Sequence, residues 1–152
     1  MEQTFSLIEN LQKSSPKITF QASDEFGWNP DTNTINYDES SENLSAYLLH
    51  EYGHALLAHK EYEKDIVLIA LERDAWKKAR DLAQQYNVTI SAEVVESSLD
   101  TYREWMHERS ICPTCSATGI QTKESYYTCL TCRSEWKVNE ARKCALRRYK
   151  TK

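Results

Sequence analysis

The segment LLHEYGHALL, residues 48–57, contains two histidines four positions apart, with a glutamate directly after the first. Apolar residues recur through residues 41–59 and no proline interrupts them, so this range predicts an amphipathic helix. On a helix, residues four apart lie on one face, with Cβ atoms about 5 to 6 Å apart. His50 and His54 can therefore reach one metal ion, with Glu51 beside it.

This H-E-x-x-H spacing is typical of zinc hydrolases. Two neutral imidazoles leave the ion strongly Lewis-acidic, and a neighbouring carboxylate can take the proton of a zinc-bound water as the water attacks a carbonyl. We therefore predict that His50 and His54 bind a catalytic zinc ion and that Glu51 is the general base. The alternative is a pair of surface histidines beside a solvated glutamate.

A third ligand is indicated further along the chain, where residues 66–86 predict a second long helix. One face of this helix carries an apolar stripe at helical spacing, formed by Leu68, Ile69, Ala75, Trp76, Ala79, Leu82, Ala83 and Tyr86. Glu72 falls within the stripe. Because burying a carboxylate costs free energy unless it is paired or bound to metal, we predict Glu72 as the third zinc ligand. The alternative is a salt bridge from Glu72 to a lysine or arginine.

Two other residues compete for this role. Asp74 lies about 200° around the helix from Glu72, on the face that carries the charged residues, so we interpret it as solvated. His59 follows His54 by five positions, about 140° around a continuous helix, and could coordinate only if the helix ended or turned sharply there. We interpret His59 as a helix-terminal residue facing water.

The remaining segments of the first 110 residues predict an α+β fold. Residues 5–12 predict a short helix, residues 17–22 and 34–37 predict strands separated by a turn-rich stretch, and residues 92–109 predict a last helix capped by Ser91. The strand at 34–37 would bind an extended peptide by strand addition if it lay at the edge of its sheet.

All five cysteines lie after residue 111, and four of them form two C-x2-C pairs separated by thirteen residues. This spacing predicts a zinc ribbon with one structural zinc ion, bound by Cys112, Cys115, Cys129 and Cys132. The alternatives are two disulfides or a redox-active pair. Cys144 lies outside the pattern, and we expect it to be a free thiol on a terminal helix.

Charge is unevenly distributed along the 152 residues, whose net charge is −4. Residues 1–111 hold 10 Lys and Arg against 20 Asp and Glu, whereas residues 112–152 hold 9 against 3. We therefore expect two domains, a metallopeptidase domain over 1–110 and a ribbon with a basic tail over 111–152. The tail predicts nucleic-acid binding through Arg142, Lys143, Arg147 and Arg148, with Trp136 and Tyr149 available for stacking. The alternatives are a solvated terminal helix, or docking on an acidic partner or on the acidic first domain.

Neither a membrane span nor a signal peptide is indicated. No stretch of 18 apolar residues occurs, and residues 1–9 carry acidic rather than basic residues. We therefore expect a cytoplasmic protein that does not contact membranes.

The segment 48–57, together with Glu72 and Ala75-Trp76, resembles compact gluzincin peptidases of the ImmA/IrrE kind. The likeness covers about residues 1–110. It implies a small zincin-like core of helices and strands, with zinc held by His50, His54 and Glu72, and with Glu51 as the base.

The resemblance also implies an activity, the zinc-dependent cleavage of a protein substrate, in that family often a transcriptional repressor. The ribbon is similar instead to the C-terminal module of SprT-like proteases, which act on DNA-associated protein and use a third histidine, for which His59 is the available residue. A further alternative is a non-catalytic regulator that binds nucleic acid through its zinc ribbon.

Overall fold

The computed structural model describes residues 2–152, with side chains described from residue 3 onward. The chain divides into two compact units, Met1–Lys60 with Leu71–Val95, and Glu61–Ala70 with Glu96–Lys152. Two long helices, α3 (Asp65–Gln85) and α4 (Ala92–Ser110), contribute residues to both units. The second unit thus contains residues 61–70 and 96–110 besides the ribbon, and the expected boundary at residue 110 stays a prediction.

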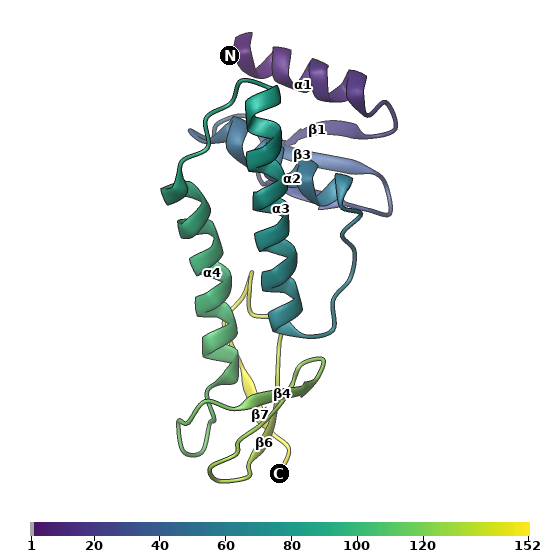
Figure 1. Ribbon diagram of the computed structural model, residues 1–152. Coiled ribbons are helices and arrows are strands. Elements are labelled where there is room, and N and C mark those ends of the chain that lie inside the picture. Colours follow the sequence, from purple (N-terminus) through teal and green to yellow (C-terminus); the bar gives the residue numbers. More distant parts are fainter. Residues whose placement is uncertain (1) are drawn as a thin grey trace. The chain divides into compact units, whose positions relative to one another are not determined.

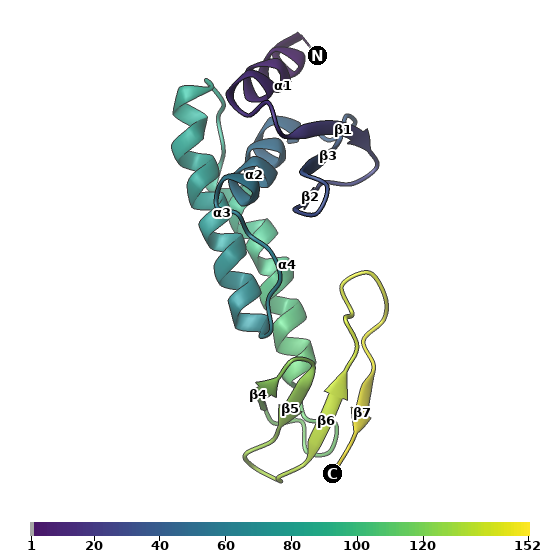
Figure 2. The same ribbon diagram turned by 90° about the vertical axis from the view of Figure 1, so that its right-hand side faces the viewer.

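The first unit combines helices with a small sheet, so its α+β class is as expected. Its elements are α1 (Glu2–Ser14), β1 (Thr19–Ser23), β2 (Gly27–Asn29), β3 (Thr34–Asp38), α2 (Leu44–Leu56) and the second part of α3. The strand order is β1-β3-β2, with β1 parallel and β2 antiparallel to β3. Helix α2 packs against β3 and β2, and α1 contacts β1 and α2 (Figures 1 and 2).

This sheet corrects two expectations. The turn-rich stretch after residue 26 contains a strand, β2, in which Trp28 pairs with Ile35; three residues are too few to show alternation in the sequence. Strand β3 lies between β1 and β2, so residues 34–37 are not at an edge and cannot accept an added strand. The edges of this sheet are β1 and β2.

Close packing of α2 against α3 sets the geometry of the candidate site. Leu48 and Leu49 of α2 are fully buried, as are Ala75 and Ala79 of the α3 stripe. A Cβ atom at Gly53 would lie 2.7 Å from the carbonyl oxygen of Ala75, closer than such contacts normally occur. Because Gly53 has no side chain, the backbones of α2 and α3 can come close together at the histidine motif.

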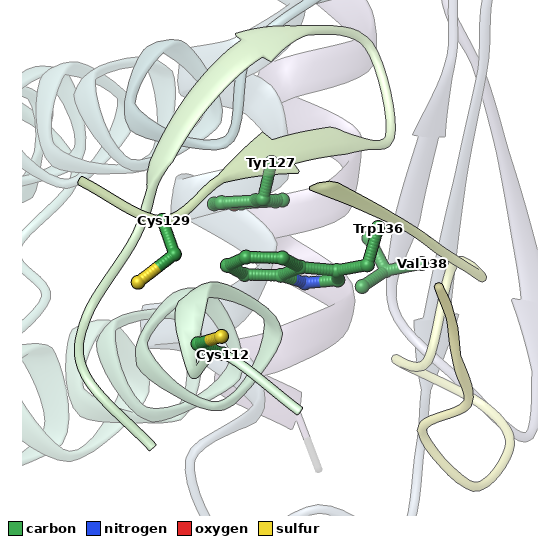
Figure 3. Packing of buried hydrophobic residues seen from close by; sticks show 5 residues of the cluster. All are labelled: Cys112, Tyr127, Cys129, Trp136 and Val138. Atoms are coloured by element: carbon green, nitrogen blue, oxygen red, sulfur yellow. The ribbon is translucent and has the colours of Figure 1, made fainter. Parts of the chain in front are cut away.

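The second unit contains a four-stranded antiparallel sheet in the order β4-β5-β6-β7 (Figure 2). The strands are β4 (Ile120–Lys123), β5 (Tyr126–Thr128), β6 (Glu135–Val138) and β7 (Arg148–Lys150). Figure 3 shows its core, in which the Trp136 indole stacks on the Tyr127 ring at 5.7 Å between centroids, with Cys112 and Cys129 beside them. Gly119 packs against the same indole, where a side chain would collide with it.

A buried polar network supports this sheet from the first residue of α3. The Asp65 carboxylate accepts hydrogen bonds from Nε and Nη2 of Arg109, at 2.8 and 3.2 Å, and from the Tyr127 hydroxyl. The Asp65 backbone N–H donates to Gln121 Oε1 at 2.7 Å, and Arg109 also donates to the carbonyl of Asn139. Both charges are buried, but each is paired and hydrogen-bonded, the condition under which burial is tolerated.

The C-terminal residues form a strand where a helix was expected. Strand β7 pairs with β6, and the loop before it is held by Asn139, which donates to the Ala145 carbonyl at 2.8 Å and accepts from the Arg147 N–H at 2.9 Å. Cys144 lies exposed in this loop as a free cysteine, so the prediction of a terminal helix was wrong. Pairing with the sheet, a long-range contact, overrides the local helical tendency of this segment.

None of the helices in residues 2–152 combines the length and apolar character needed to cross a membrane.

Candidate metal centres

Helices α2 and α3 bring His50, His54 and Glu72 together inside the first unit. His50 Nε2 lies 2.9 Å from Glu72 Oε2, His54 Nε2 lies 3.2 Å from Glu72 Oε1, and the two Nε2 atoms are 3.2 Å apart. All three residues are buried, and Glu72 is only 5% exposed. The sequence predicted these three residues as one ligand set, and the structure brings their donor atoms close together.

These distances fit a metal ion bound between the three residues. A tetrahedral zinc ion with bonds of about 2.0 to 2.1 Å has neighbouring ligands about 3.3 Å apart, close to the spacings measured here. The ion pairs recorded for Glu72 are with these two histidines, whereas Asp74 has an exposed carboxylate that pairs with Arg73. The set of two imidazoles and one carboxylate can therefore hold a cation.

The charge state of the site also favours a cation. Burial raises the pKa of Glu72, but hydrogen bonds from the His50 and His54 rings outweigh it and hold the pKa well below its usual range. Burial lowers the pKa of His54, but the hydrogen bond and charge of Glu72 and the charge of Glu51 give a net increase. The buried Glu72 carboxylate is therefore negatively charged, and both imidazoles contact it. This charge favours a cation in the site.

His59 is next to the site, in a position that helical geometry did not predict. Helix α2 ends at Leu56, and Ala58 adopts a left-handed φ of 54°. The His59 N–H then bonds the His54 carbonyl at 3.0 Å and the Ala58 N–H bonds the Ala55 carbonyl at 3.1 Å, the two hydrogen bonds of a Schellman motif. This turn brings His59 Nδ1 to 2.8 Å from His54 Nδ1, so the expectation that His59 faces water was wrong.

The contact to His59 is on the opposite side of the His54 ring from Glu72. His54 uses Nε2 toward Glu72 and Nδ1 toward His59, and His59 is not one of the three residues whose donor atoms meet. Burial and the charge of His54 lower the pKa of His59. His59 thus contacts a candidate ligand rather than acting as one.

Two tryptophans contact this arrangement. Trp76 stacks on the His50 ring at 4.2 Å between centroids, and Trp28 Nε1 donates to the His59 carbonyl at 3.3 Å. Trp28 therefore ties strand β2 to the turn that follows α2. Neither role could be read from the sequence, because both depend on pairs of residues at least 26 positions apart.

Glu51 follows His50 on α2 and is half-buried. Its charge contributes to the raised pKa of His54, which places the carboxylate within electrostatic reach of the ligand set. Glu51 is not among the three residues whose donor atoms converge. Glu51 therefore lies near the ligand set without belonging to it.

The second group consists of the four cysteines of the ribbon. Their Sγ atoms all lie within 4.8 Å of one another, with 3.6 Å between Cys112 and Cys132 and 3.5 Å between Cys115 and Cys129. All four are free cysteines, which argues against disulfides. Ligands of a tetrahedral zinc with four thiolates lie about 3.8 Å apart, so this group fits a zinc ion as well.

Backbone geometry in the first knuckle favours a thiolate. Burial raises the pKa of Cys112, but backbone N–H groups of Cys115 and Thr114 outweigh it and lower the pKa overall; the Thr114 N–H lies 3.4 Å from Cys112 Sγ. Ser116 and Arg133, which follow the two knuckles, adopt left-handed φ values of 64° and 66°. The two knuckles are therefore alike in backbone conformation.

Three of the basic residues expected to contact nucleic acid have contacts within the second unit. Arg142 lies over the Tyr102 ring at 4.1 Å, Arg148 donates to the Glu108 carbonyl at 2.6 Å, and the backbone of Arg147 bonds Asn139. Lys143 is exposed. Trp136, expected to stack on bases, is fully buried in the core, so that expectation was wrong.

Comparison with known proteins gave no match to this chain among protein-family models, curated proteins or solved structures.

Proposed function

We propose that this chain is a zinc-dependent endopeptidase of the compact gluzincin type, similar to ImmA/IrrE proteins, with zinc held by His50, His54 and Glu72. The observation that carries the proposal is the buried Glu72 carboxylate, whose two oxygens lie 2.9 and 3.2 Å from the two Nε2 atoms of an H-E-x-x-H helix. A carboxylate inside an apolar stripe costs stability unless it has such partners. A second, structural zinc is proposed for the four cysteines.

The proposed chemistry divides between the ion and Glu51. A bound zinc ion supplies Lewis acidity, which acidifies water and polarises a carbonyl group. Glu51 accepts the proton of the attacking water and then passes it to the amine that leaves as the peptide bond breaks. His50, His54 and Glu72 hold their donor atoms in place because α2 and α3 are packed together at Gly53.

Glu72 is preferred over His59 as the third ligand, and this choice separates the gluzincin proposal from the SprT-like alternative. His59 Nδ1 contacts His54 Nδ1, on the far side of that ring from Glu72 Oε1. A third histidine ligand would need its ring nitrogen beside the two Nε2 atoms, where the carboxylate lies instead.

The proposed substrate is a protein in extended conformation, for which a transcriptional regulator is the candidate that the resemblance suggests. Strand β2 is an edge of the sheet, and Trp28 within it bonds the His59 carbonyl beside the site. An edge strand can pair with an extended peptide through backbone hydrogen bonds. We propose that β2 takes the role first expected of residues 34–37.

The test combines metal counting with cleavage of a peptide library. We expect two zinc ions per wild-type chain, one in His54→Ala and in Glu72→Ala, and two in Glu51→Gln. Cleavage of the library, followed by mass spectrometry, should fall at least about 100-fold in Glu51→Gln because the proton acceptor is lost while the metal stays.

Asp74→Ala is the matched control, because Asp74 is a carboxylate on the same helix but exposed. It should keep two zinc ions and full cleavage. One zinc in the wild-type chain, no loss of zinc in Glu72→Ala, or unchanged cleavage by Glu51→Gln would each contradict the proposal.

A further inference from the structure

A row of four side chains crosses all four strands of the sheet in the second unit. Lys123 is opposite Tyr126, Tyr126 is opposite Lys137, and Lys137 is opposite Tyr149. The row, called the Lys-Tyr row below, alternates cation and aromatic ring from β4 to β7; Figure 2 shows these four strands side by side.

The Lys-Tyr row lies on the outer face of the sheet. Successive residues of a strand point to opposite faces, and Tyr127, Trp136 and Val138 are buried in the core on the inner face. Tyr126 and Lys137, their neighbours in β5 and β6, therefore point outward. Tyr149 is 52% exposed, and both lysines are exposed.

Both lysines of the row have their ammonium groups over the Tyr126 ring. The Lys123 Nζ atom lies 4.4 Å and the Lys137 Nζ atom 5.6 Å from the centroid of the Tyr126 ring. With strands about 4.8 Å apart, the row is about 14 Å long. Ammonium groups and rings thus alternate over a length that can contact a few nucleotides, and the Tyr149 ring at its β7 end is exposed.

The ribbon segment that carries the row has more basic than acidic residues. Residues 112–152 hold 9 Lys and Arg against 3 Asp and Glu. Glu135 also lies on the outer face, in register with Thr128 and so two residues along β6 from Lys137, and the exposed Glu124 follows Lys123 in the turn between β4 and β5. An anionic partner would therefore meet the two lysines of the row with carboxylates beside them.

We propose that the Lys-Tyr row binds single-stranded nucleic acid. An unpaired base can stack on the exposed Tyr149 ring, and phosphates can pair with the two lysines. A duplex hides its base faces and would use the lysines alone. An acidic protein segment would use the lysines but has no bases to stack on the rings.

This binding surface shares Tyr149 with the basic tail that the sequence indicated but otherwise differs from it, and it is independent of the proposed peptidase site. It needs Lys123 and Tyr126 on the first hairpin, neither of which belongs to the tail. It makes no use of Trp136, which is buried, or of Arg148, which bonds the Glu108 carbonyl.

The test measures fluorescence anisotropy of a labelled twelve-nucleotide oligothymidine with the full, zinc-loaded chain. We expect tighter binding to the single strand than to its duplex with oligoadenine. If both lysines contact phosphates, affinity should fall about sevenfold between 50 and 200 mM salt, from a slope of about −0.7 per phosphate on a single strand.

Variants separate stacking from charge. Tyr149→Ala should weaken binding at least about fivefold, whereas Tyr149→Phe, which keeps the ring, should bind like wild type. Lys137→Ala should reduce the salt slope by about 0.7. Lys150→Ala is the matched control, because Lys150 is next to Tyr149 but in register with Trp136, so that its side chain leaves the strand on the other face.

Zinc content and thermal unfolding of each variant would show that the ribbon remains folded. The proposal is overturned if the single strand does not bind at 50 mM salt, or if Tyr149→Ala binds like wild type. It is also overturned if Lys150→Ala weakens binding as much as Lys137→Ala, or if labelled polyglutamate binds as tightly with the same response to the variants. None of these outcomes depends on Glu51, so the peptidase proposal stands or fails separately.

Discussion

Ala58 adopts a backbone conformation that determines what His59 can do. A left-handed conformation costs a residue with a Cβ atom about 1 to 2 kcal/mol, and here the two Schellman hydrogen bonds offset that cost. The turn holds the His59 backbone between the His54 carbonyl and the Trp28 indole, and its ring against His54 Nδ1. Because zinc would occupy Nε2 of His54, the proton of that ring would lie on Nδ1 and be donated to His59.

We therefore predict that His59→Ala weakens zinc binding roughly 10- to 100-fold, the usual effect of removing the hydrogen-bond partner of a metal-bound histidine. Competition with a chromophoric chelator measures the affinity. At saturating zinc the variant should still hold two ions, which distinguishes a residue that orients a ligand from a ligand itself.

Lys60→Ala provides the control for this prediction, because Lys60 is the exposed neighbour of His59. An unchanged affinity in His59→Ala, or the loss of one ion at saturation, would show that His59 does not act by orienting His54.

At the scale of elements, the site depends on how closely α2 and α3 approach. His50 and His54 come from one helix and Glu72 from the other, so the distance between the helix axes sets the distance between carboxylate and imidazoles. Gly53 faces the Ala75 carbonyl at the point of closest approach. The same residue therefore affects both packing and ligand geometry.

Gly53→Ala should destabilise the protein by about 1 to 3 kcal/mol, because the added methyl group overpacks the contact and pushes the helices apart. Denaturant unfolding measures this loss, and chelator competition should show weaker zinc binding in the same variant. Gly27→Ala is a suitable control, since a Cβ atom there meets nothing within 4 Å. Equal stability of the two variants would contradict the packing argument.

At the scale of the whole molecule, the two metal sites have different structural consequences. The core of the ribbon consists of Tyr127, Trp136, Val138 and two of the four cysteines, with Ala117 and Leu146 packed against it. Zinc binding to such thiolate sites contributes on the order of 10 kcal/mol, more than so small a core can supply. The ribbon should therefore depend on its metal for folding.

We predict that Cys129→Ser lowers the zinc content from two ions to one and abolishes the near-ultraviolet circular dichroism of the stacked Trp136 and Tyr127. Cys144→Ser is the control: Cys144 is exposed and outside the four-cysteine group, so both signals should stay unchanged. A folded ribbon in Cys129→Ser would show that the core is sufficient without zinc.

Much of the site could be predicted because its residues follow regular spacings within short segments of the chain. The four-residue spacing of His50 and His54, the glutamate within the stripe of α3 and the paired C-x2-C motifs each depend on residues close in sequence. The helix bounds were close for the same reason, and Ser91 caps α4 as expected, through its hydroxyl and the Val94 N–H at 3.2 Å. Strand β2 and the C-terminal strand were missed because each is defined by its pairing with another strand.

The sequence by itself determined the α+β class, the candidate ligand residues and the four-cysteine pattern, since helical and knuckle geometries bring near neighbours together in a fixed way. Only the tertiary structure decided that His59 turns back onto His54, that Asp65 pairs with Arg109, and that two lysines and two tyrosines form one row. A turn, the packing of helices or the register of strands brings the residues of these contacts together. The free energy that selects them comes from burial and pairing, which no local pattern records.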